Sequence, residues 1–297
     1  MTAPNGFLTG RGYSHERMAA AATTERDQTI VIRPPKGFAG LGLGDLWRFR
    51  ELLLFLTWRD IKVRYKQTLL GAAWAVLQPF LTMIVFTLVI NHIGRIKTPI
   101  PYPLFALSTL ALWYYFSNSV NLTSASLVGS SALITKVYFP RISVVLSPIF
   151  AGLVDYCLAF CLVLGAMAYY SFAPPLHALL VPLFVVLAGL MALGLGLALS
   201  ALNVSYRDIR YAVPFVLQLW LFASPVAYPG SAVPERFKLF YTLNPMTGVV
   251  EGYRWSLLGV GRVHASSLAI SIGTLLVLLV GGALYFSRAE RAFADVI

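Results

Sequence analysis

The feature that most constrains the fold of this chain is a set of long stretches without Asp, Glu, Lys or Arg. A bilayer core is about 30 Å thick, so an α-helix needs about 20 apolar residues to cross it. The stretches that reach this length are residues 67–94, 98–135, 156–206, 211–234 and 263–287. Only 12% of all residues are charged, against about 25% in a soluble domain. The sequence therefore predicts an all-α membrane protein.

The third stretch is too long for one membrane span. Apolar sequence begins at Ile142, is interrupted by Asp155 and continues to residue 206. In its middle, "SFAPPLHA" (171–178) contains two adjacent prolines, which end or bend a helix. This segment divides residues 142–202 into two spans and brings the predicted number of transmembrane helices to six.

The distribution of Lys and Arg predicts the orientation, because cytoplasmic flanks carry the excess. With a cytoplasmic N-terminus, the inner segments hold 17 Lys and Arg and the outer segments hold 6. Both termini are therefore predicted to be cytoplasmic, in a multi-pass protein of the cytoplasmic (inner) membrane. The net charge of +11 is explained by anionic membrane lipid, and no nucleic acid partner is needed.

The chain divides into four predicted parts. The first apolar stretch starts near residue 67, so no cleavable signal peptide is visible. The residues before 45 are polar, small and interrupted by Pro and Gly. The predicted parts are a disordered cytoplasmic tail (1–44), an amphipathic interface helix (45–66), a six-span domain (67–288) and a cytoplasmic C-terminal tail (289–297).

The predicted interface helix has an apolar stripe and a basic end. The stripe recurs at helical spacing and consists of Leu46, Phe49, Leu52, Leu53 and Leu56. Residues 58–66 alternate as a strand would, but a lone strand at a membrane surface leaves its backbone unpaired, so a helix is favoured. The basic residues are Arg59, Lys62, Arg64 and Lys66. They either reach lipid headgroups and fix the topology, or meet an anionic substrate or a cytosolic partner.

Four stretches carry a resemblance to a known family. They are "WRDIKVRYKQTLLGAAWAVLQP" (58–79), "KVYFPR" (136–141), "SPVAYP" (224–229) and "LNPMTGVVEGYR" (243–254). In this order they resemble the permease subunit of ABC-2-type polysaccharide exporters, which move O-antigen, capsule and teichoic acid precursors. The resemblance runs from about residue 45 to the C-terminus.

The resemblance implies a homodimer that works with two copies of a separate cytosolic ABC ATPase on a lipid-linked polysaccharide. The sequence contains no G-x-x-x-x-G-K-[ST] motif, the usual cradle for ATP phosphates. ATP and Mg are therefore expected on the partner ATPase, with no cofactor on this chain.

The two short cytoplasmic loops resemble the coupling helices that contact the ATPase. Each loop ends at a proline, where a helix stops or turns. The alternative is an ordinary interfacial loop whose basic residues set the topology. The expected contact residues are Lys136, Tyr138, Phe139, Arg141, Tyr206, Arg207, Asp208 and Arg210.

Residues 228–265 are too charged for a clean span and too apolar for a free loop. They fit a re-entrant pair of short helices in the outer leaflet, and in the family such a pair forms an extracytoplasmic gate. The gate motif maps onto Asn244, Pro245, Glu251 and Arg254. Glu251 and Arg254 are three residues apart, close enough to pair on one helix face. If residues 239–260 instead crossed the membrane, the C-terminus would lie outside.

Aromatic residues are candidates to line a path for sugars, because ring faces accept the C–H side of a sugar. The candidates are Tyr102, Phe105, Trp113, Tyr114, Tyr115, Phe116, Trp220 and Phe222. Aromatic residues also gather at membrane interfaces and pack between helices, which is the alternative.

Asp155 lies deep in a predicted span. It is a functional candidate, because ionisable residues inside membranes are costly. The alternative is a hydrogen-bonded contact with Ser or Thr of a neighbouring helix.

The predicted function is the permease subunit of an ATP-driven polysaccharide exporter. Two alternatives remain, an ABC-2 exporter of small hydrophobic compounds and a membrane scaffold for envelope assembly that needs no ATPase. No cluster of carboxylates or of His and Cys is present for catalysis, so no catalytic or metal site is predicted.

Overall fold

The computed structural model describes residues 43–290, except residues 67, 69, 95–96 and 138. The predicted tail up to residue 42, and residues 291–297 of the C-terminal tail, lie outside this part. All regular structure in the described residues is helical, so the predicted all-α class is confirmed. The longer helices are α3 (Arg50–Lys66), α4 (Ala73–Phe86), α5 (Tyr102–Gly129), α7 (Ile142–Tyr169), α8 (Val181–Ser205), α9 (Ile209–Ala223), α11 (Pro245–Leu258) and α12 (Ala265–Ala289). The shorter ones are α2 (Leu43–Arg48), the π-helix η2 (Thr87–Ile93), α6 (Ser131–Ile134), α10 (Lys238–Leu243) and the 3₁₀ turns η3 (Leu176–Leu180), η4 (Gly230–Ala232) and η5 (Glu235–Phe237).

Four helical segments of the described chain are long and apolar enough to cross a membrane. They are Ala73–Ile90, Ile142–Tyr169, Leu176–Ser205 and Ala265–Ala289. The predicted division between the two middle spans is confirmed, since α7 ends at Tyr169 and η3 begins at Leu176. α5 has the length of a span but is less apolar, and α9 has only 15 residues. The count of six spans therefore stays a prediction.

α9 is shorter than the predicted span 211–234. It ends at Ala223, and Ser224 has extended backbone angles. The residue before a proline is disfavoured in helical conformation, and Pro225 follows directly. The end of this predicted span was therefore wrong.

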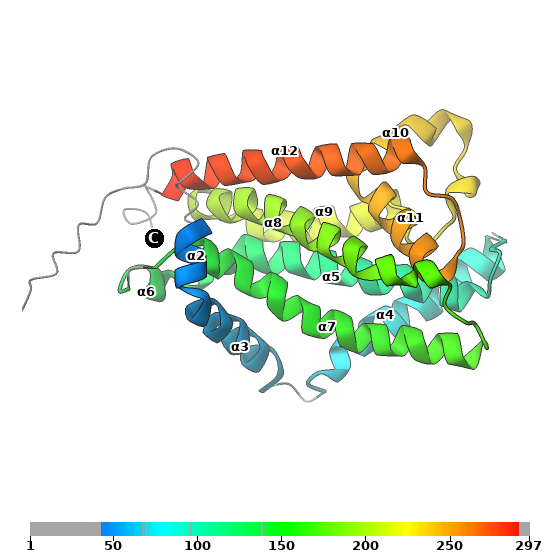
Figure 1. The fold of residues 1–297 in the computed structure, drawn as a ribbon, viewed down its shortest axis with the longest axis horizontal. Helices are drawn as coiled ribbons and strands as arrows, with labels where there is room; N and C mark the ends of the chain where they lie inside the picture. The colour runs from blue at the N-terminus through cyan, green and yellow to red at the C-terminus, as the bar shows by residue number, and fades with distance from the viewer. Residues whose placement is uncertain (1–42, 67, 69, 95–96, 138, 291–297) are drawn as a thin grey trace, which may run out of the picture. The chain divides into compact units, whose positions relative to one another are not determined.

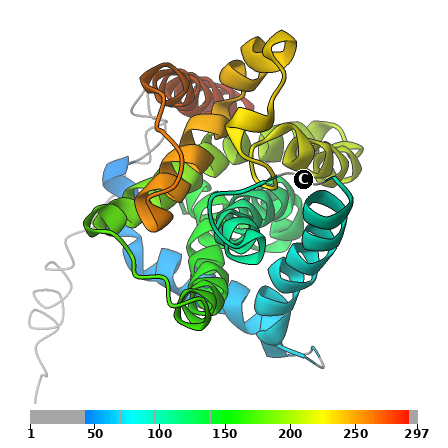
Figure 2. The same cartoon turned by 90° about the vertical axis from the view of Figure 1, so that its right-hand side faces the viewer.

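α5 lies in the middle of the other helices when the bundle is viewed from its end (Figure 2). It packs against α4, α7, α8, α9 and α11. Several of its buried hydroxyls are satisfied by its own carbonyls, as in the bonds from Ser108 to Phe105 O (2.9 Å) and from Thr123 to Ser119 O (2.7 Å). A helix that protein surrounds on most sides does not need a uniformly apolar surface.

α8 and α12 approach closely at two glycines. A Cβ on Gly194 would lie 2.8 Å from the Leu278 carbonyl carbon, and one on Gly282 would lie 2.3 Å from Gly194 O. Small residues at such crossings let helix backbones touch, which is a common source of helix association in membranes.

The predicted interface helix is present as α2 and α3, which meet at Phe49. Residues 58–66 are helical, as predicted. The apolar stripe packs on the protein: Leu56 is fully buried, and Leu46, Phe49, Leu52 and Leu53 contact the same cluster, which includes residues of α7, α8 and α12. The position of this helix in the membrane surface stays a prediction. α2, α3 and α6 lie toward one end of the bundle, and α10 and α11 lie toward the other (Figure 1).

Candidate functional site

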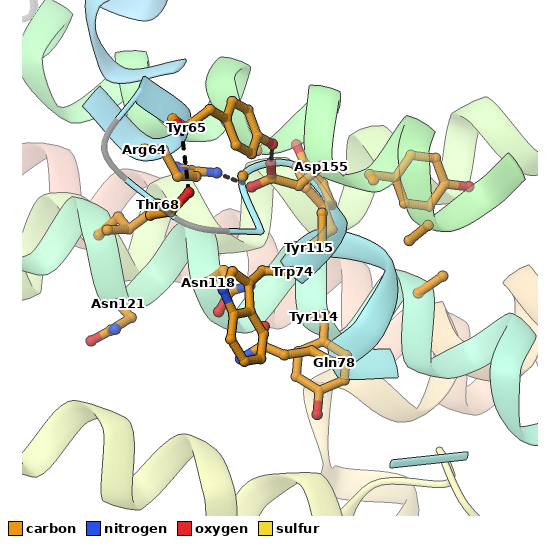
Figure 3. A pocket seen from close by; sticks show the side chains of 17 residues that line it. Arg64, Tyr65, Thr68, Trp74, Gln78, Tyr114, Tyr115, Asn118, Asn121 and Asp155 are labelled. Atoms are coloured by element: carbon orange, nitrogen blue, oxygen red, sulfur yellow. Dashed lines mark hydrogen bonds and ion pairs between the residues drawn. The ribbon is translucent and has the colours of Figure 1, made fainter. Parts of the chain in front are cut away.

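A cavity of about 300 Å³ lies where α3 meets the membrane helices. Its walls come from α3, α4, α5, α7 and the segment between α3 and α4 (Figure 3). Its charged and polar lining residues are Arg64, Tyr65, Thr68, Gln78, Tyr114, Tyr115, Asn118, Asn121, Asp155 and Tyr156, with Trp74 beside them.

Asp155 forms the central polar contact of this cavity. One carboxylate oxygen pairs with the Arg64 guanidinium, and the other accepts a hydrogen bond from the Tyr65 hydroxyl (Figure 3). The intramembrane acid therefore makes a helix–helix contact, but with Arg and Tyr of α3 and not with the predicted Ser or Thr. Burial lowers the pKa of the Arg64 guanidinium.

A second carboxylate also joins α3 to α7. Asp60 accepts a hydrogen bond from the Ser147 hydroxyl (2.7 Å) and pairs with Arg59 (2.8 Å). Ser147 and Asp155 are eight residues apart on α7, about two helical turns. α3 is thus held along α7 at two levels.

The four predicted headgroup residues fall into two pairs. Arg59 and Arg64 are half-buried and have carboxylate partners within the chain. Lys62 and Lys66 are exposed, and the Lys62 ammonium lies 5.4 Å from the centre of the Trp58 ring. Lys62 and Lys66 are therefore the more accessible cations of this end of α3.

Three side-chain amides line the cavity and were missed by the sequence analysis: Gln78 of α4, and Asn118 and Asn121 of α5. None of them forms a side-chain hydrogen bond with another described residue. Beside them, the Tyr114 hydroxyl is hydrogen-bonded to Thr82 Oγ1 at 2.7 Å. The signal that could have revealed the amides is their position inside otherwise apolar stretches.

The first predicted coupling loop contains the short helix α6, whereas the second, residues 206–208, is a turn and not the predicted helix. Lys136 and all three residues of the turn, Tyr206, Arg207 and Asp208, are exposed, as is Arg210. Tyr138 lies outside the described residues.

Two residues of the first loop connect it to the bundle. Phe139 is buried. Arg141 donates to the backbone oxygen of Glu290, just after α12, and its Nε lies 3.8 Å from the Glu290 carboxylate. Burial raises the pKa of this carboxyl, and Arg141 opposes the shift.

Asn244 and Pro245 join the two helices α10 and α11, so the predicted break between two short helices is found; its position in the outer leaflet stays a prediction. The Asn244 side-chain oxygen accepts from Met246 N (3.0 Å), which caps α11, and from Trp220 Nε1 (2.9 Å). Its amide nitrogen donates to Ala223 O and Ser224 Oγ, both at 3.0 Å. One side chain thereby fixes the start of α11 against the end of α9.

Glu251 and Arg254 do not pair with each other as predicted. Glu251 accepts a hydrogen bond from the Tyr241 hydroxyl (2.5 Å), and its other oxygen lies 3.7 Å from His264 Nδ1.

Arg254 is only 3% exposed. It donates to the carbonyls of Pro225 and Val226 and lies over the Phe105 ring, 3.9 Å from its centre. These carbonyls lie one and two residues beyond Ser224, so Arg254 and Asn244 hold the same segment.

The predicted aromatic path is mostly interior. Tyr102, Phe105, Trp113, Tyr115 and Phe116 are buried, and Trp113, Phe116 and Trp220 pack with ring centres 5.4–6.2 Å apart. Tyr114 and Tyr115 line the cavity, and Phe222 is exposed. The packing alternative fits most of this set.

Comparison with known proteins gives a consistent result. Residues 51–258 match the ABC-2 type transporter family. The chain is 31% identical over 255 residues to the O-antigen export system permease protein RfbA of Myxococcus xanthus, covering 85% of this chain and 98% of that protein. It is 25% identical to an O-antigen export system permease protein RfbA of Klebsiella pneumoniae (83% and 95% covered) and 24% identical to the polysialic acid transport protein KpsM of Escherichia coli (80% and 92%).

Proposed function

The chain belongs to the ABC-2 type transporter family, and we propose that it is the permease subunit of an ATP-driven exporter that moves a lipid-linked polysaccharide across the cytoplasmic membrane. Names of relatives with nearly complete coverage support the substrate class: O-antigen export for two and polysialic acid transport for a third. They give no support to export of small hydrophobic compounds. The proposed assembly is a homodimer with two ABC ATPase subunits and with both termini in the cytoplasm.

The observation that carries the proposal is the construction of α3. It combines exposed cations, Lys62 and Lys66, with carboxylate contacts to α7 through Asp60 and Asp155. An anionic lipid phosphate is attracted by such cations. In our proposal the substrate therefore first meets the protein on the element that is tied to α7.

In our proposal α3 is also connected, through α7, to the loop that we expect the ATPase to contact. The first predicted coupling loop leads into α7, and its residue Arg141 contacts the residue after α12. A displacement of this loop by the ATPase is passed to α7, and through Asp155 and Ser147 to α3. ATP-driven motion and substrate contact thus act on one connected set of helices.

The proposal is tested in the cell that makes the protein. Deletion of the gene should abolish the surface polysaccharide and leave its lipid-linked precursor inside the cell, and the wild-type gene should restore export. Purification of the tagged chain should recover a P-loop ATPase in equal amount. A deletion strain with unchanged surface polysaccharide would rule out the proposed substrate class, and the consistent absence of an ATPase would favour the scaffold alternative.

The headgroup role has a sharper test. Lys62→Gln combined with Lys66→Gln should lower export severalfold and leave the protein level unchanged, because both side chains are exposed. The matched control is Arg48→Gln combined with Arg50→Gln, which removes the same charge from the other end of the interface helix. Equal export by both variants would contradict a headgroup role of Lys62 and Lys66.

A further inference from the structure

We infer that the cavity between α3, α4, α5 and α7 binds one neutral sugar residue of the exported glycan inside each subunit. The inference rests on the proposed function and deepens it, because it places a sugar site within a single subunit and not on the dimer axis. Its starting point is the set of amides Gln78, Asn118 and Asn121, which share the cavity and make no side-chain hydrogen bond to another described residue.

The three amides can reach a ligand in the cavity, because Gln78 is exposed and Asn118 and Asn121 are half-buried. Gln78 lies on a helix that is apolar enough to span a membrane, and Asn118 and Asn121 lie on the central helix α5. Within a membrane span, an amide that meets neither water nor a hydrogen-bond partner destabilises the folded state, so these positions favour a polar ligand or water in the cavity. Other polar side chains of α5, such as Ser108 and Thr123, are instead satisfied by carbonyls of the same helix. The three amides are therefore available to form hydrogen bonds with a polar ligand in the cavity.

The lining selects the chemistry of that ligand. An amide offers both a donor and an acceptor, which matches hydroxyl groups that also do both. Trp74 and Tyr114 add aromatic surface, which suits the C–H face of a sugar ring. While Arg64 and Asp155 are paired, their charges compensate each other, so the cavity in this state has no net preference for an anion or a cation. A neutral, polyhydroxylated ring fits all three features.

Size and position agree with this assignment. A volume of about 300 Å³ is at the lower end of the range for small-molecule sites, which suits one ring and not an extended chain. The cavity is lined by Arg64 and Tyr65 of the helix that carries Lys62 and Lys66. In this proposal a lipid phosphate on these lysines places the first sugars at the α3 side of the cavity, whose wall Arg64 shares with the amides (Figure 3).

The test measures binding directly. The permease with its ATPase is placed in nanodiscs of phosphatidylcholine, so that no lipid with a polyol headgroup competes. The probe is the repeat-unit oligosaccharide released by mild acid from the surface polysaccharide of the host cell, and its binding is titrated by saturation-transfer NMR. The test variant is Asn118→Leu with Asn121→Leu. The control is Gln218→Leu, which removes an exposed amide of α9 that does not line the cavity.

We expect the wild type and Gln218→Leu to bind alike and the double variant to bind about tenfold more weakly. Equal binding by the double variant, or no binding by the wild type, would overturn the sugar site; export by the wild-type gene would then still support the proposed function. If the double variant does not assemble, Gln78→Leu on α4 provides the same comparison from another wall of the cavity.

Discussion

Two arginines, one half-buried and one buried, lie toward opposite ends of the bundle and are held in different ways. Arg64 of α3 pairs with the Asp155 side chain, and 24% of its own side chain is exposed. Arg254 of α11 is 3% exposed and donates to the backbone carbonyls of Pro225 and Val226. The first contact joins two ionised side chains, and the second joins a side chain to the main chain.

The difference indicates different roles. Main-chain carbonyls cannot rotate away or be replaced without a change of fold, so Arg254 acts as a permanent tie between α11 and the segment after α9. A carboxylate partner is exchangeable, because a phosphate offers a guanidinium the same type of charge-assisted bond. We therefore expect Arg64 to change partners during transport and Arg254 to keep its partners.

The largest effect is expected from Arg254→Leu. It leaves two buried carbonyls and the packing site over Phe105 without the guanidinium. Hydrogen bonds to charged groups contribute about 1.5–3 kcal/mol each, so the folded protein should be lost or unfold at a much lower temperature. Thermal unfolding in detergent, followed by size-exclusion chromatography, measures this. Arg254→Lys should rescue poorly, because an ammonium lacks the planar fork; a normal unfolding temperature for Arg254→Leu would contradict the permanent tie.

A smaller effect is expected when the Arg64–Asp155 pair is broken. Asp155→Asn and Arg64→Gln should each destabilise the protein, and the double variant should be more stable than their sum predicts, with a coupling of about 1–2 kcal/mol. The amount of exported polysaccharide should differ between the two single variants. Asp155→Asn keeps a guanidinium for the phosphate of the proposed lipid-linked substrate and should retain most export. Arg64→Gln removes that guanidinium and should lose most export. Equal loss of export would mean that the tie alone matters.

Most of the helical framework could be predicted from the sequence, because it depends on local properties. The charge-free stretches predicted where the long apolar helices lie. Pro174 and Pro175 predicted the division between α7 and α8, and Asn244 with Pro245 predicted the break before α11. Each of these signals acts within a few residues of itself.

The partners of polar groups could not be predicted, because they depend on packing between distant segments. Asp155 meets Arg64, which lies 91 residues away in the sequence. Glu251 and Arg254 were expected to pair with each other. Instead, Glu251 accepts a hydrogen bond from Tyr241, and Arg254 donates one to the Pro225 carbonyl. The apolar stripe of the interface helix was correctly recognised, but its periodicity does not distinguish a lipid surface from a protein surface.

Asn244→Ala tests the end of the bundle that contains α10 and α11, through a weaker contact than that of Arg254. Asn244 caps α11 and donates to Ala223 O and Ser224 Oγ. Loss of an N-cap costs about 1 kcal/mol, so the unfolding temperature should fall by less than for Arg254→Leu. Asn244→Asp keeps the acceptor for Met246 N but not the two donors, and should lie between wild type and Asn244→Ala. If Asp and Ala behave alike, the bonds to residues 223 and 224 matter more than the cap.

The smallest effect is expected for Glu235 and Lys238, which form an ion pair at the same end of the bundle with side chains 84% and 53% exposed. They have the same three-residue spacing as Glu251 and Arg254, yet they do pair, because no buried carbonyl or hydroxyl competes for them at the surface. Exposed pairs contribute about 0–1 kcal/mol. Glu235→Gln with Lys238→Gln should therefore unfold within a degree or two of wild type, as measured by the same chromatography assay. A loss as large as that of Arg254→Leu would show that charge at this end, and not burial against main-chain carbonyls, determines stability.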